Sequence, residues 1–207
     1  MRLSPPVVGI DVGGPSKGYH AVALCGREVK KVQSADPKEI ADWCDRMNAR
    51  AIGVDAPCCW STTGRARPAE RALMKKGIWC FSTPKRETAL EHPKRNFAWM
   101  ISGEALYQSL TARRPLYKGN RSERAAVFET FPHAIVCALS GACIPAKNKS
   151  RVRRKLLERL GVDTTSLTNI DWIDAGLCAL TAREFVNNEF VEHGDVETGF
   201  IVVPENR

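Results

Sequence analysis

The sequence predicts an α/β domain: a mixed five-stranded sheet flanked by helices, with a helical insertion after the fourth strand. Three observations predict it. Short turns separate the first three apolar runs, a segment of helical periodicity precedes the fourth, and a long irregular stretch precedes the fifth. Tight turns join antiparallel strands, whereas a helical crossover joins parallel ones. We expect residues 1–207 to form a single domain, with the insertion at about 58–124.

The first three strands are predicted at residues 7–12, 19–24 and 29–33. Residues 13–18 (GGPSKG) and Gly26 provide the turn residues between them. Three strands joined by such short turns form an antiparallel meander.

A helix is predicted to begin at Asp36-Pro37, because apolar residues then recur at helical spacing. Residues 51–57 (AIGVDAP) follow as a buried strand that Pro57 ends. A helix between two strands indicates a crossover, so this fourth strand is expected to pair in parallel with an earlier one.

The remaining elements alternate in the same way. Residues 127–131 are predicted as the fifth strand, and residues 199–203 either as a last edge strand or as packing. Helices are expected at residues 68–76, 101–112, 133–139, 150–160 and 173–190.

The chain is basic, with 31 Lys and Arg against 23 Asp and Glu and a net charge of +8. Such an excess suits a polyanionic partner, nucleic acid before membrane, although a merely basic protein has the same balance. The longest uncharged run, residues 130–146, is interrupted by prolines and is too short to span a bilayer. Pro5 and Pro6 stand where a signal peptide has its apolar core, so we expect a cytoplasmic protein.

The eight cysteines include no CxxC pair and lie mostly in apolar runs. We interpret them as reduced core residues. His133, Cys137 and Cys143 have the donor atoms to hold a metal, but their spacing matches no structural zinc pattern.

Carboxylates follow several of the predicted strands. Asp11, Asp55 and Glu129 each come after a run of apolar residues, and Asp171 and Asp174 share one face at the start of the last helix. A buried carboxylate is costly unless it is paired or bound to a cation. The carboxyl ends of parallel strands meet at one edge, where these oxygens would hold Mg²⁺ or Mn²⁺. The alternative is structural, with each acid capping a helix or a turn.

Several ordered blocks of the sequence resemble the family called domain of unknown function 429, whose members are predicted RNase H-like nucleases. The RNase H-like superfamily carries one acid on the first strand, another on the fourth and one or two on the last helix, and the Asp171-x-x-Asp174 spacing is similar to that of RuvC-type resolvases. The blocks are VGIDVGGPSKGYHAVAL, AIGVDAP, ARPAERAL, VFETFP and DWIDAGLCALTA, within residues 7–186.

The resemblance implies an RNase H-like fold and an acidic metal centre. One departure is that the family often shows Arg-x-x-Asp-Arg where this chain has Arg67, Glu70 and Arg71. The longer Glu70 is better explained by an intrahelical salt bridge than by a role in the site.

The expected activity is metal-dependent hydrolysis of nucleic-acid phosphodiester bonds. Two divalent ions, Mg²⁺ or Mn²⁺, about 4 Å apart, would clamp the phosphate. Asp11 would bridge them, with Asp55 and Asp174 on either side as further catalytic ligands. Glu129, also expected to be catalytic, or Asp171 would complete the metal shell.

Basic residues near these acids are expected to bind the backbone of DNA or RNA, although a solvated helix face is the alternative. A branched substrate would suit a homodimer. The candidate substrate-binding residues are Arg67, Arg71, Lys147, Arg151 and Arg154.

Two other functions stay open. An actin-like or sugar-kinase-like nucleotide-binding protein or phosphotransferase shares the opening strand and Gly-rich turn. Such proteins need two halves, however, and Lys17 is followed by Gly18 rather than by the Ser or Thr of a P-loop. The other alternative is a non-catalytic nucleic-acid-binding module of the same fold.

Overall fold

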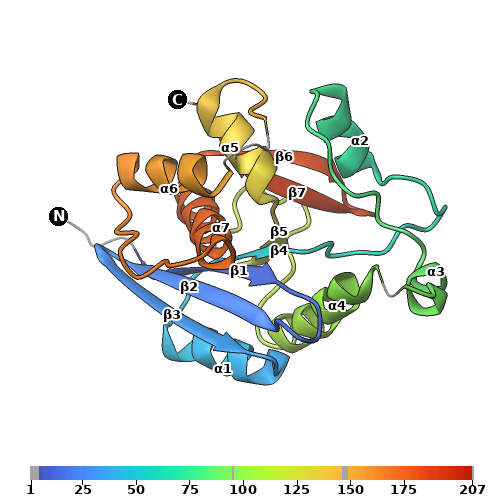
Figure 1. Ribbon diagram of the computed structural model, residues 1–207, viewed down its shortest axis with the longest axis horizontal. Helices are drawn as coiled ribbons and strands as arrows, with labels where there is room; N and C mark the ends of the chain where they lie inside the picture. The colour runs from blue at the N-terminus through green and yellow to red at the C-terminus, as the bar shows by residue number, and fades with distance from the viewer. Residues whose placement is uncertain (1–4, 95, 146–148, 207) are drawn as a thin grey trace.

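The computed structural model describes residues 5–94, 96–145 and 149–206. A seven-stranded mixed sheet forms its centre. The strands are β1 (Val7–Val12), β2 (Tyr19–Cys25), β3 (Glu28–Ser34), β4 (Ile52–Asp55), β5 (Val127–Glu129), β6 (Phe190–Asp195) and β7 (Gly199–Pro204). Their order across the sheet is β3-β2-β1-β4-β5-β7-β6 (Figure 1).

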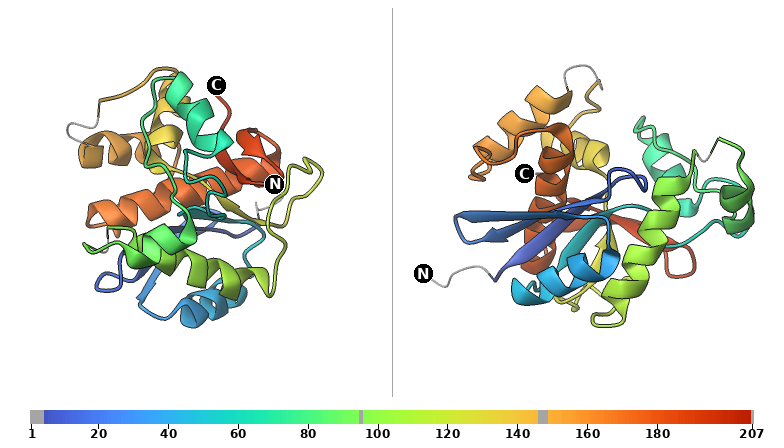
Figure 2. Two further views of the ribbon diagram at one scale, coloured as in Figure 1. Left: turned by 90° about the vertical axis from the view of Figure 1, so that its right-hand side faces the viewer. Right: turned by 60° about the horizontal axis from the view of Figure 1, so that its bottom comes forward.

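Helices cover both faces of the sheet (Figure 2). One core lies between the sheet and α1 and α4, and the other between the sheet and a layer that includes α5, α6 and α7. The helices are α1 (Pro37–Arg46), α2 (Pro68–Lys75), α3 (Arg86–Glu91), α4 (Ala98–Thr111), α5 (Pro132–Ser140), α6 (Lys149–Arg159) and α7 (Ile170–Asn187).

The predicted meander and the predicted crossover are both confirmed. Strand β2 pairs antiparallel with β1 and with β3, and β4 pairs in parallel with β1. Helix α1 makes the crossover, and its first turn is capped by the Asp36 side chain, which accepts a hydrogen bond of 2.8 Å from the Lys38 amide. Strand β5 then adds in parallel to β4.

The prediction of five strands is wrong, because a C-terminal hairpin adds two more. The last helix was expected to reach Phe190, but α7 ends at Asn187, and Asn188 turns the chain with a left-handed φ of 65°. Strand β6 begins at Phe190, and its polar sequence (FVEHGD) hides its strand character. Strand β7 lies inside the sheet, in parallel with β5, rather than at an edge.

The insertion at about 58–124 packs onto both layers. Helix α4 packs against α1, whereas α2 packs against β6. Buried residues of the insertion therefore contribute to the same two cores as the rest of the chain, Leu73 to one and Leu106 to the other. Among the described residues, no helix is both long enough and apolar enough to cross a membrane.

Candidate functional site

Asp11 and Asp55 lie side by side at the carboxyl ends of β1 and β4. The two strands are parallel, and their register pairs Asp11 directly with Asp55. Residues that are paired in this way project to the same face of a sheet. The two acids therefore lie at the same edge of the sheet, as the sequence predicts.

Helix α7 crosses this face unusually close to the strands, because glycine stands two residues before each aspartate. A Cβ atom on Gly9 would lie 1.9 Å from the Ala179 backbone nitrogen, and one on Gly53 would lie 2.8 Å from the Cys178 carbonyl oxygen. Such distances exclude any side chain at either position. Asp174 lies one helical turn before Cys178, so the close contact brings it toward the same end of the strands.

The carboxylates of Asp11 and Asp55 have no hydrogen-bond or ion-pair partner within the described parts of the chain. Burial raises the pKa of Asp55 well above its ordinary value, and the charges of Asp11 and then Asp174 raise it further. Burial, followed by Asp174 and Asp171, raises the pKa of Asp11 to about 8. Without a cation, the two acids therefore do not both ionise at neutral pH.

The two acids of α7, in contrast, each contact a basic side chain. Arg153 of α6 donates from Nη1 to both oxygens of Asp174 at 2.5 Å, and both side chains are buried. Lys17, from the turn after β1, contacts the two oxygens of Asp171 at 3.1 and 3.2 Å. Asp171 does not cap α7, since the Asn169 side chain accepts the bond from the Trp172 amide.

Sequence reasoning did not find the pairing of Arg153 with Asp174. Arg153 belongs to a run of basic residues on α6, and nothing in that run distinguishes the inward side chain from its exposed neighbours. The glycines two residues before Asp11 and Asp55 were a usable signal, because the repeated Gly-x-Asp pattern marks strands that a helix approaches closely.

Glu129 lines one small cavity together with Asp55, but its carboxylate is held by other groups. The register pairs it with Val54, so its side chain projects to the face opposite Asp55. There Arg67 binds it with two bonds, Nη1 to Oε2 at 2.9 Å and Nη2 to Oε1 at 2.6 Å, and the Cys58 amide donates to Oε2 at 2.9 Å. We therefore leave Glu129 out of the candidate metal centre.

Arg67 is buried between two carboxylates rather than presented to a substrate. Its side chain is 2% exposed, and its Nε also contacts Glu70 at 2.8 Å. The intrahelical salt bridge expected for Glu70 is thus present. Glu70 also accepts bonds from the amide and the hydroxyl group of Thr83, so the cluster holds the start of the insertion to β5.

The other candidate substrate-binding residues differ in accessibility. Arg71 and Arg151 are exposed. Arg154 donates to the carbonyl oxygens of Thr164 and Leu167, so it supports the loop before α7. Lys147 lies outside the described residues.

We expect the metal-free protein to lose stability as the pH rises from 6.5 to 8. Native Asp11, with its pKa near 8, keeps a proton that the unfolded chain, with a value of 3.8, has already lost. Stability falls with pH wherever the native state holds more protons, by about 1 kcal/mol per pH unit for one proton. Thermal melts in EDTA measure this slope. An Asp11→Asn variant with the same slope as the parent would contradict the assignment.

Comparison with known protein families assigns this chain to one of them. No curated protein matches this sequence. The family model described as "Protein of unknown function (DUF429)" matches residues 9–198. This range runs from β1 to the last turn of the sheet and contains Asp11, Asp55, Asp171 and Asp174. The chain therefore belongs to the DUF429 family of proteins of unknown function.

Proposed function

We propose that this protein is a nuclease that hydrolyses nucleic-acid phosphodiester bonds with the help of Mg²⁺ or Mn²⁺. The observation that carries the proposal is the half-buried pair Asp11 and Asp55, which lie in register at the carboxyl ends of parallel strands without a counterion among the described residues. Two neighbouring carboxylates without a counterion lower the stability of the folded state unless they bind a cation, which is why such pairs are typical of functional sites.

The donor chemistry of the three aspartates suits a hard divalent ion, although within the described residues only His133, Cys137 and Cys143 have donor atoms gathered closely enough to form a ready group of three. Asp11 and Asp55 offer carboxylate oxygens from neighbouring strands, and Asp174 offers two more from α7. Oxygen ligands of this kind suit Mg²⁺ and Mn²⁺. A bound ion would supply Lewis-acid chemistry at a phosphodiester and would activate water as the nucleophile.

The bases around the acids have two roles in this proposal. Arg153 donates to both oxygens of Asp174, so a metal ion bound there would share this carboxylate with a neighbouring positive charge. A phosphate group entering the site offers the guanidinium group an alternative anion. Lys17 holds Asp171 at the rim, which leaves Asp171 as an outer ligand at most.

The arrangement of the fold supports the same function. The sheet contains a meander followed by parallel strands, and the unpartnered acids stand on its first and fourth strands with Asp174 on the long helix that crosses them. This is the distribution of acids that the resemblance to RNase H-like nucleases implies.

The eight free cysteines support the proposed cytoplasmic location, because thiols persist in a reducing compartment.

A cleavage panel tests the proposal directly. The protein is incubated with single-stranded, duplex, hybrid and branched nucleic acids in Mg²⁺, in Mn²⁺ and in EDTA. Cleavage of at least one substrate only when metal is present supports a nuclease and identifies its substrate. If no substrate is cleaved under any condition, the nuclease proposal fails, and binding of ATP would then favour the nucleotide-binding alternative.

We expect the exposed face of α6 to bind the nucleic-acid backbone. Arg151 and Lys155 are exposed on this helix, whose buried Arg153 contacts Asp174. Replacing both with alanine would weaken binding and reduce the slope of log K against log salt concentration by roughly 2, because each phosphate contact contributes about 0.9. Fluorescence anisotropy in EDTA measures the slope. The control is the double variant Lys38→Ala/Arg46→Ala on α1, at the opposite face of the sheet. If the two double variants give the same salt slope, α6 is not part of the interface.

A further inference from the structure

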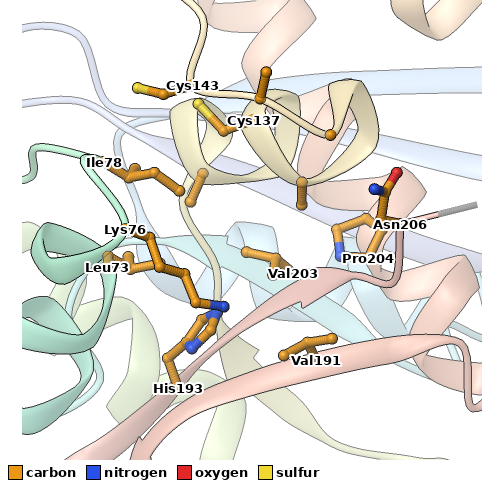
Figure 3. A pocket seen from close by; sticks show the side chains of 14 residues that line it. Leu73, Lys76, Ile78, Cys137, Cys143, Val191, His193, Val203, Pro204 and Asn206 are labelled. Carbon is orange, nitrogen blue, oxygen red and sulfur yellow. The ribbon is translucent and has the colours of Figure 1, made fainter.

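His133, Cys137 and Cys143 form a compact group of donor atoms on the layer that contains α7. Helix α5 places His133 and Cys137 one turn apart, and Gly141 ends the helix in a left-handed conformation, so the chain carries Cys143 back toward them. One donor atom from each residue lies within 4.8 Å of the other two. Figure 3 shows the sulfur atoms of Cys137 and Cys143 close together at the rim of a cavity of about 250 Å³.

The spacing of the donors is close to that of a bound tetrahedral ion. Zinc bonds of about 2.3 Å to sulfur and 2.0–2.1 Å to nitrogen place neighbouring ligands roughly 3.5 Å apart. The distance from Cys137 Sγ to His133 Nε2 is already 3.9 Å. Small side-chain adjustments therefore suffice to close the group on an ion.

The polar contacts of the two thiols are also compatible with metal binding. The Ile144 amide donates to Cys137 Sγ at 3.4 Å, a contact that stabilises the thiolate form. The Cys143 thiol donates to the Gly77 carbonyl oxygen at 3.2 Å, and this bond is given up when the thiol loses its proton. Gly77 follows α2, so the group lies where the turn after α2 meets the end of α5.

We infer that His133, Cys137 and Cys143 form a Zn²⁺ site, separate from the Mg²⁺ or Mn²⁺ centre of the proposed function. Two sulfur donors and one imidazole nitrogen select a soft or borderline ion, whereas the carboxylates near α7 select a hard one. Three protein ligands leave a fourth position, and Cys143 is exposed, so water would complete the tetrahedron. Binding releases the two thiol protons to solvent.

Titration of the reduced, metal-stripped protein with Co²⁺ tests the site, because tetrahedral cobalt bound to thiolates absorbs visible light. We expect one ion per chain, full displacement by Zn²⁺, and an affinity at least tenfold lower in Cys143→Ser. His133→Gln provides a second variant that leaves the buried Cys137 in place. Neither readout depends on cleavage activity, so this test and that of the proposed function can fail separately.

The vicinal thiols Cys58 and Cys59 provide the matched control. Their sulfur atoms lie 3.9 Å apart on another part of the fold, and Cys58→Ser/Cys59→Ser should retain the cobalt spectrum. Loss of the spectrum in this control, or an unchanged cobalt affinity in Cys143→Ser, would overturn the assignment. A parent protein that shows no thiolate absorption with excess Co²⁺ would also overturn it. Circular dichroism of each variant separates loss of ligands from loss of fold.

Discussion

We expect Asp55→Asn to leave the protein folded and to lower metal-dependent cleavage roughly 10³-fold, equivalent to about 4 kcal/mol of barrier. The amide keeps the size of the side chain but removes the charge that would bind the cation. Burial and the charge of Asp11 raise the pKa of Asp55 well above its ordinary value, so the amide also removes the cost of protonating this carboxyl group, and the metal-free variant should melt at or above the temperature of the parent. Initial cleavage rates in Mn²⁺ and melts in EDTA give the two results.

Asp42→Asn is the matched control for this experiment. Asp42 lies on α1 at the opposite face of the sheet and forms an exposed ion pair with Arg113. Exposed pairs contribute about 0–1 kcal/mol, so neither activity nor stability should change much. If Asp55→Asn cleaves as fast as this control, Asp55 has no part in catalysis and the candidate metal centre is wrong.

Arg67→Met should destabilise the fold by about 3–5 kcal/mol. The guanidinium group is the single cation between the buried carboxylates of Glu70 and Glu129 within the described structure, and methionine would leave both acids without it. Urea denaturation at neutral pH measures the effect.

Arg71→Met separates this effect from the general loss of an arginine. Arg71 lies on the same helix, but it is exposed and donates to the Ala66 carbonyl oxygen rather than to a buried carboxylate. We expect its replacement to cost less than 1 kcal/mol. A similar small cost for Arg67→Met would show that the buried acids are compensated by other means.

The sequence was sufficient to predict the arrangement that brings Asp11 and Asp55 together. Short Gly-rich turns and one helical crossover determine the order of the first four strands, and these signals are local. Asp174 was also found, because it follows Asp171 by three residues at the start of the last helix, where the resemblance to RNase H-like proteins implies an acid. Its partner Arg153 was not, since the partner depends on how α6 lies against α7, which is a tertiary property.

Glu129 shows why a position at the end of a strand is not enough to place an acid in the site. Its position after an apolar run is like that of Asp55, but the side chains of a strand alternate between faces. Whether an acid faces α7 or α4 therefore depends on a register offset of one residue, which the sequence of a three-residue strand does not reveal. Strand β6 was missed for a related reason, because its polar residues at the sheet edge obscure the apolar pattern.

The place of β7 inside the sheet has a consequence for how the protein is made. Strand β5 pairs with β4 on one side and with β7 on the other, although more than sixty residues of chain separate β5 from β7. During synthesis, Leu116 can already pair with Val127 of β5, but the end of β5 at Glu129 has no partner on this side until β7 has been made. Open edges invite pairing with other chains. The short contact of β5 with Leu116 therefore limits the length of edge that stays open before β7 completes the sheet.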